Sequence, residues 1–148
     1  MRYNNPFKIG ALSVLVFLAG CVSMEPLPAQ KSLYERLGGK GAITAVVEDF
    51  VGRVAADNRI NKFFAKADIP RLKTQLVNQI CEASGGPCKY TGGDMKIVHR
   101  GMGVTGAAFD ALVGDLVATL DKFKVGEREK NDLLGALGPM KKDIVEKS

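Results

Sequence analysis

The 148-residue sequence contains one histidine, His99, and three cysteines, Cys21, Cys81 and Cys88. A single imidazole excludes metal sites built from several histidines, and it leaves only one base for Ser–His–Asp catalysis. Because no Gly-x-Ser-x-Gly motif accompanies His99, serine hydrolysis is disfavoured as well. Three cysteines are too few for a disulfide-rich scaffold, so each of them needs its own explanation.

His99 stands among apolar neighbours, Met95, Val98 and Met102, and glycines follow closely after it. A lone histidine on an apolar helical face is more often a structural residue than a ligand. A neutral imidazole is nevertheless able to bind one axial position of haem iron without a second protein ligand. The residues alone leave both interpretations open.

The first 20 residues have the pattern of an export signal. Arg2 and Lys8 precede an uncharged run at 9–20, which is shorter than the roughly 20 apolar residues that a transmembrane helix needs. The run ends in Leu-Ala-Gly followed by Cys21, which resembles the lipobox of bacterial lipoproteins. That resemblance implies cleavage before Cys21 and lipidation of this cysteine. The alternative is an ordinary secretion signal in which the cysteine falls by chance.

We therefore expect a lipoprotein signal peptide at 1–20, a lipidated N-terminus and flexible tether at 21–31, and one folded domain at 32–148. Val22, directly after the lipidated position, favours the periplasmic face of the outer membrane and thus a membrane contact through the lipid anchor. Loss of the two basic residues of the signal lowers the formal charge of +5 by two. Since no basic stripe is interleaved with aromatic residues, nucleic acid is not an expected partner.

The folded part predicts an all-α domain, because apolar residues recur at helical spacing and no alternating strand pattern occurs. Ser32 and Glu35 fit a capping box at the start of the first helix. The predicted helices are a short one that ends at Gly38 and Gly39, one over 41–56, one from Asp68 to before Gly85, one over 94–100, one capped by Thr105, and one from Glu127 that Pro139 bends.

Seven short motifs follow one another between residues 32 and 145. They are SLYERLGG from Ser32, VVEDF from Val46, FF from Phe63, RLK from Arg71, GGP from Gly85, YTG from Tyr90 and HRGMGVT from His99. In order and spacing they resemble the truncated haemoglobins, and group I in particular. The resemblance implies a two-over-two helical sandwich around haem b, with a diatomic gas (O2, NO or CO) as the ligand and His99 as the proximal iron ligand.

The same resemblance implies a set of further haem contacts. In chain order they are Phe64, Arg71, Leu72, Leu76, Tyr90, Met95, Val104, Phe109 and Leu112. Phe64 matches a ring that packs against the porphyrin, and Arg71 and Tyr90 match positions near the haem propionates, where guanidinium and hydroxyl groups suit anionic oxygens. The alternative for the apolar residues is ordinary core packing, and for Arg71 it is an exposed surface charge.

The distal side departs from group I. Members usually have a tyrosine after the phenylalanine matched by Phe50, where this chain has Val51, and often a glutamine at the position of Leu76. Leu72 matches a position that is commonly apolar or glutamine. Because the usual hydrogen-bond donors are missing, we expect a largely apolar distal pocket that releases O2 quickly. Such a pocket suits NO, CO or electron transfer more than O2 storage.

Three polar side chains remain near this pocket. Gln79 follows Leu76 by three residues and is expected to reach the pocket from the same helical face. Lys73 and Gln75 lie to either side of that face, and solvent exposure is the expectation for both. Lys73 as an internal sixth iron ligand is the alternative, because relatives of this family place such a ligand on this helix.

Cys81 and Cys88 are expected to form a disulfide, because an exported domain folds in an oxidising compartment. Two buried thiols or a redox-sensing pair are the alternatives. No Cys-x-x-Cys-His motif is present, so covalent c-type haem attachment is not indicated.

Two functions follow from the sequence. The first is a lipid-anchored haem globin, in which NO dioxygenase-like or peroxidase-like turnover would need an unknown reductase or electron donor that this sequence does not contain. The second is a haemless helical lipoprotein that serves as an interaction or structural module. His99 in its apolar setting is the feature that separates them.

Overall fold

The computed structural model describes residues 30–147, so the predicted signal peptide and Cys21 lie outside the described residues. Within 30–147 the chain forms helices and no strand, apart from one isolated bridge between Thr105 and Lys147. The elements are α1 (Leu33–Arg36), α2 (Gly39–Ala56), η1 (Asn61–Phe64), α3 (Ile69–Ala83), α4 (Met95–Val98), α5 (Gly106–Lys122), α6 (Glu127–Leu137), η2 (Gly138–Met140) and α7 (Lys141–Ile144). The all-α prediction is confirmed.

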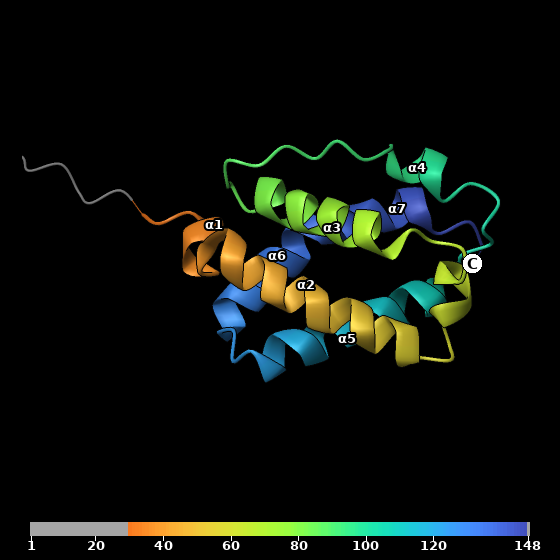
Figure 1. Cartoon of the computed structure of the whole chain (residues 1–148), viewed down its shortest axis with the longest axis horizontal. Coiled ribbons are helices and arrows are strands. Elements are labelled where there is room, and N and C mark those ends of the chain that lie inside the picture. The colour runs from red at the N-terminus through yellow and green to blue at the C-terminus, as the bar shows by residue number, and fades with distance from the viewer. Residues whose placement is uncertain (1–29, 148) are drawn as a thin grey trace, which may run out of the picture.

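Four long helices form the body of the molecule. α2 packs against α3 and α5, and α3 also packs against α6 (Figure 1). After α3 the chain runs back along that helix in an extended loop and reaches the short α4 (Figure 1). Among the described residues, no helix combines the length and the apolar character that crossing a membrane requires.

Local side-chain caps explain where the helices begin. The Ser32 hydroxyl accepts a hydrogen bond from Glu35 N, and the Glu35 carboxylate accepts one from Ser32 N, as the predicted capping box requires. Asp68, Asp94 and Thr105 each accept a backbone hydrogen bond in the first turn of α3, α4 and α5. The predicted starts at these residues are therefore confirmed.

Two boundaries differ from prediction for reasons that lie in the backbone. α2 begins at Gly39 rather than at 41, because the turn after α1 is already complete at Gly38, whose φ is +89°. The fourth helix ends at Val98, with His99 as its C-cap, because Gly101 takes a φ of +78°. Pro139 falls in the short 3₁₀ turn η2 between α6 and α7, where a bend was predicted.

The hydrophobic core lies where α2 meets α3, α5 and α6. Val47, Leu120 and Leu133 are each only 1% exposed, and Ile80 and Cys81 add buried side chains from the end of α3. Because this core is tightly packed, α2 and α3 form a rigid support for the elements that pack against them.

Cys81, in the last turns of α3, is joined by a disulfide to Cys88 in the loop that leads to α4. Ser84 and Gly86 also turn back onto α3 through hydrogen bonds with Ile80 O and Cys81 O. The covalent link and these hydrogen bonds fix the direction in which the chain leaves α3 on its way to α4.

Reduction of this disulfide is expected to lower the free energy of unfolding of the haem-free protein by about 2.5 kcal/mol, because the reduced unfolded chain regains the freedom of the loop 81–88. Urea unfolding with and without a phosphine reductant measures the change. The double variant Cys81→Ala with Cys88→Ala is the control, since its unfolding midpoint should not respond to the reductant. Equal midpoints for the oxidised and reduced wild type would contradict the prediction.

Candidate haem site

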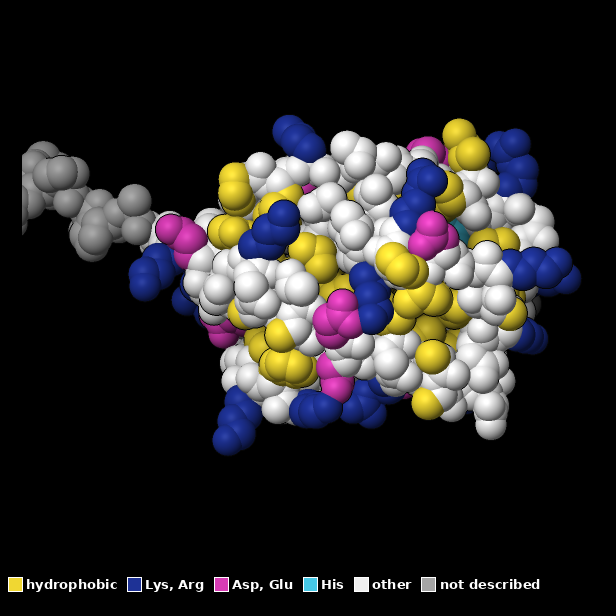
Figure 2. Space-filling view, viewed as in Figure 1, with side chains coloured by type: hydrophobic (Ala, Val, Ile, Leu, Met, Phe, Trp, Pro, Cys, Tyr) yellow, Lys and Arg dark blue, Asp and Glu magenta, His cyan; other side chains and the backbone are white. Residues whose placement is uncertain are grey.

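A cavity of about 360 Å³ lies between α2, η1, α3, α4 and α5, and the C-terminal elements close its remaining side. This volume is within the range of roughly 300–1,000 Å³ that small-molecule sites span. Its lining is apolar and aromatic except for four polar side chains, Gln75, Gln79, Tyr90 and His99. Hydrophobic side chains reach the surface between the end of α2 and the start of α3, where η1 and α3 contribute to the cavity wall (Figure 2).

His99 is the C-cap of α4, and its half-buried imidazole lines this cavity. Its Nδ1 lies 2.7 Å from the carbonyl oxygen of Met95, one helical turn earlier. Because a carbonyl oxygen only accepts, Nδ1 carries the proton and Nε2 keeps its lone pair. This is the tautomer of a metal-ligating imidazole, whose other ring nitrogen is oriented by a backbone hydrogen bond.

The structure brings most of the predicted site residues together. Those that line the cavity are Phe50, Val51, Phe64, Leu72, Leu76, Gln79, Tyr90, Met95, His99, Phe109 and Leu112. Arg71 and Val104 are not among the lining residues. Arg71 is exposed in the first turn of α3, and Val104 is buried beside the C-terminal residues of the chain.

Gln75 corrects an expectation. Solvent exposure was expected, but the half-buried side chain lines the cavity and donates from Nε2 to Thr91 Oγ1 at 3.3 Å. Its Oε1 is buried without a hydrogen-bond partner among the described residues. The reason is non-local: the loop that follows the disulfide places Thr91 over this side of α3.

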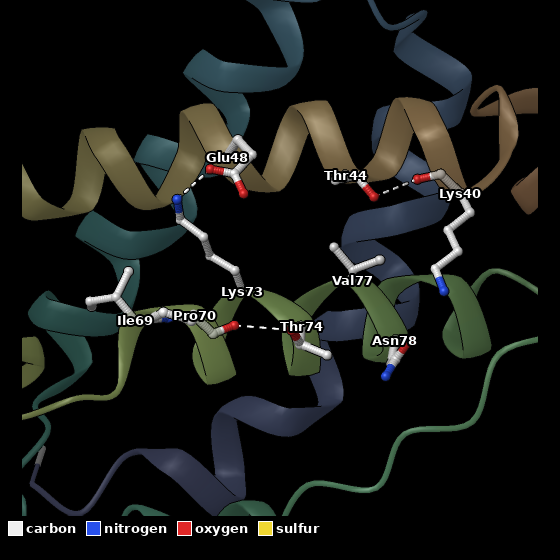
Figure 3. Close-up of a pocket in the computed structure, with 9 residues that line it drawn as sticks. All are labelled: Lys40, Thr44, Glu48, Ile69, Pro70, Lys73, Thr74, Val77 and Asn78. Carbon is white, nitrogen blue, oxygen red and sulfur yellow. Dashed lines mark hydrogen bonds and ion pairs between the residues drawn. The ribbon is translucent and has the colours of Figure 1, made fainter.

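Lys73 lies outside the cavity. It forms an ion pair with Glu48 across a groove between α2 and α3, in which Lys40 and Asn78 also stand (Figure 3). This arrangement gives no support to Lys73 as an internal sixth ligand.

Gln79 lines the cavity and contacts two methionine sulfur atoms. Its Nε2 lies 3.7 Å from Met95 Sδ and 3.5 Å from Met140 Sδ, which are weak sulfur acceptors. Sequence reasoning did not assign Met140 and Ile144 to the site, although both line the cavity. Their helical spacing indicated burial, but burial alone does not say against which cavity a residue packs.

Tyr90 is held at the cavity edge by a hydrogen bond from its hydroxyl to Gly93 O at 2.9 Å. Burial, and after it the charge of Asp94, raise the pKa of Tyr90 above its ordinary value, so the phenol stays a donor. Gly92 is required beneath the ring, because a Cβ there would come within 2.3 Å of it.

Glu146 accepts hydrogen bonds from backbone N–H groups of the loop after His99, and these hydrogen bonds hold the pKa of Glu146 below its usual value.

The residues present fit a haem group. The cavity offers apolar walls, an imidazole with a free Nε2, and no charged side chain among its described lining residues. Val98 and Met102 line it and are nevertheless 46% and 37% exposed, so a large apolar group in the cavity would cover them. A histidine ligand in an apolar cleft is the arrangement that holds haem in globins.

The helical fold and this site define a haem-binding globin. Residues 32–146 match the family model described as bacterial-like globin, and the chain belongs to that family. Its cofactor is haem with iron, and the ligands of globins are diatomic gases.

Several relatives are similar over most of their length. The group 1 truncated haemoglobin of Mycolicibacterium paratuberculosis is 39% identical over 113 residues, which are 76% of this chain and 83% of that protein. A crystal structure of truncated haemoglobin from Tetrahymena pyriformis in its Fe(III) form has a TM-score of 0.75 and 32% identity, and covers 78% of this chain and 98% of its own. The 2/2 haemoglobin of Synechococcus sp. PCC 7002, with covalently attached haem, has a TM-score of 0.73 at the same identity and coverage. These likenesses favour the haem globin over the haemless module.

Replacement of His99 by alanine is expected to weaken haem binding by at least about a hundredfold, because changes that merely disturb an iron ligand already cost roughly ten- to a hundredfold. Titration of the haem-free protein with hemin, followed at the Soret band, measures the effect. Lys96→Ala is the matched control on the exposed side of α4 and should bind haem like the wild type. An unchanged Soret band in His99→Ala would exclude His99 as the ligand.

Proposed function

We propose that this globin is a lipid-anchored protein of the periplasmic face of the outer membrane, and that its site favours NO or CO, or electron transfer, over O2 storage. His99 is the proximal ligand in this proposal. The single observation that carries the ligand preference is that Val51, Leu72 and Leu76 line the cavity without a hydrogen-bonding group.

The polar groups that remain in the cavity have other partners. Gln75 donates to Thr91, Gln79 lies against Met95 and Met140, and Tyr90 donates to Gly93. O2 gains partial negative charge as an iron ligand, and a hydrogen bond to a charged group contributes about 1.5–3 kcal/mol. The lack of such a donor corresponds to roughly ten- to a hundredfold faster O2 release.

Haem iron, when bound, supplies a sixth coordination position for a diatomic ligand. His99 would hold the iron through its imidazole, and the apolar walls of the cavity would keep water away from it. Any redox turnover, including NO detoxification, would take its electrons from a separate reductase or electron donor. This separate donor is the partner that the proposal requires.

The export part of the proposal is supported by the pattern of residues 1–21 and by the disulfide. A Cys81–Cys88 bond persists in an oxidising compartment and is rare in the cytosol. The first described helix begins at Leu33, and in this proposal the residues between Cys21 and that helix serve as the tether between the lipid and the globin domain.

A donor placed in the cavity is expected to reverse the ligand preference. Leu76→Gln should slow O2 dissociation by roughly ten- to a hundredfold, because the amide N–H stabilises the partly negative ligand. Stopped-flow displacement of O2 by CO measures the rate. Leu76→Met is the matched apolar control and should leave the rate near that of the wild type. A wild type that already releases O2 as slowly as Leu76→Gln would contradict the proposal.

Lipidation is tested independently of haem. Metabolic labelling with a palmitate analogue should tag the wild type and not Cys21→Ala. Cys88→Ala is the control for nonspecific thiol labelling and should be tagged like the wild type. Equal labelling of the wild type and Cys21→Ala would exclude a lipid at this cysteine.

A further inference from the structure

The short helix that carries His99 has little packing of its own. α4 spans Met95–Val98, none of its residues is buried, and Ile97 is 62% exposed. A helix of one turn is not stable by itself in water, because nucleation costs more than its few hydrogen bonds return. The position of the His99 imidazole therefore depends on contacts made by the segments before and after α4.

The segment after α4 is held by one carboxylate from the far end of the chain. Glu146 Oε1 accepts from Gly101 N at 2.6 Å, and Glu146 Oε2 accepts from Gly103 N at 2.6 Å. Gly101 and Gly103 have φ of +78° and +68°, and this left-handed backbone turns both N–H groups toward the same anion. Two backbone N–H groups of one loop that point at the same carboxylate form a concave site for an anion.

The backbone around Glu146 is fixed as well. Glu146 N donates to Val104 O at 2.9 Å and Lys147 N donates to the same oxygen at 3.2 Å, while Gly106 N donates to Lys147 O at 3.2 Å. The C-terminal residues thus pair with the chain on the far side of the glycine loop. The preceding helix, α7, packs on α4, and its Ile144 lines the cavity.

We propose that Glu146 is a positioning residue for the iron ligand: its bridge to Gly101 and Gly103 fixes the loop 101–103 and thereby the orientation of the His99 imidazole. The inference rests on the proposed role of His99 as proximal ligand. Met102 N donates to His99 O at 3.1 Å, so a shift of this loop acts directly on the backbone of the ligand residue.

Glu146→Gln weakens the bridge to the two glycines while it leaves the size of the side chain nearly unchanged. Its single amide oxygen satisfies one N–H, and its NH2 group faces the other without accepting from it. Asp143→Asn is the matched control, because it makes the same change of charge three residues away, and the Asp143 side chain has no hydrogen bond among the described residues. Glu146→Asp keeps the charge, but it is too short to reach both glycines, and it serves as a second variant if Glu146→Gln fails to fold.

Three measurements on the full chain test the proposal. In Glu146→Gln we expect amide exchange at Gly101 and Gly103 of the haem-free protein to be at least about tenfold faster. The iron–histidine stretching band of the ferrous haem protein should shift or broaden. Haem transfer to an excess of apomyoglobin should be about tenfold faster, which corresponds to about 1.4 kcal/mol. Glu146→Asp should fall between the wild type and Glu146→Gln, and Asp143→Asn should match the wild type.

The outcomes are distinguishable from a failure of the proposed function. Amide exchange does not depend on haem, and His99→Ala tests the ligand separately. Exchange rates in Glu146→Gln equal to those of Asp143→Asn would overturn the bridge itself. Faster exchange with an unchanged iron–histidine band would reduce Glu146 to a structural residue and overturn its positioning role.

Discussion

The constraint on which this structure depends is that one histidine on a single helical turn must point into a cavity that the chain leaves open. A cavity lined by apolar side chains forgoes the packing contacts that stabilise a filled core. The chain offsets this loss in its core, where Val47, Leu120 and Leu133 are almost fully buried. The core and the site share α2 and α3, and Phe50, Val51, Val54 and Ile80 belong to both.

Because α4 contributes no buried side chain, its place is set by the chain on either side of it. Upstream, the Cys81–Cys88 disulfide and the hydrogen bond from Tyr90 to Gly93 fix the path of the loop. Downstream, Glu146 holds the glycines after His99. The hydrogen bond from His99 Nδ1 to Met95 O then sets the ring within α4 itself. Together these contacts fix the backbone around α4 and the His99 ring, and they take the place of the side-chain packing that a longer helix would have.

Local chemistry explains why much of this was predictable. Asp68, Asp94 and Thr105 mark helix starts because each satisfies its own first turn, which needs no knowledge of the rest of the chain. The position of Gln75 was predicted wrongly, because the residue that covers it, Thr91, comes from a loop 16 residues away. The bridge of Glu146 to Gly103 spans 43 residues and has no sequence signal at all. Helical spacing predicts on which face of its helix a side chain lies, but it does not predict which distant residue packs against that face.

The same distinction governs the chemistry of the site. The resemblance to group I truncated haemoglobins placed His99, Phe64 and Leu72 through the motifs that contain them, and the other apolar wall residues through their positions relative to those motifs. The proposed ligand preference rests instead on side chains that differ from the usual group I residues, Val51 and Leu76. Aliphatic side chains at these positions need no hydrogen-bond partner when they are buried, so the fold tolerates them. A single fold thus keeps a histidine in an apolar cleft, while the polarity of the other lining residues is free to vary.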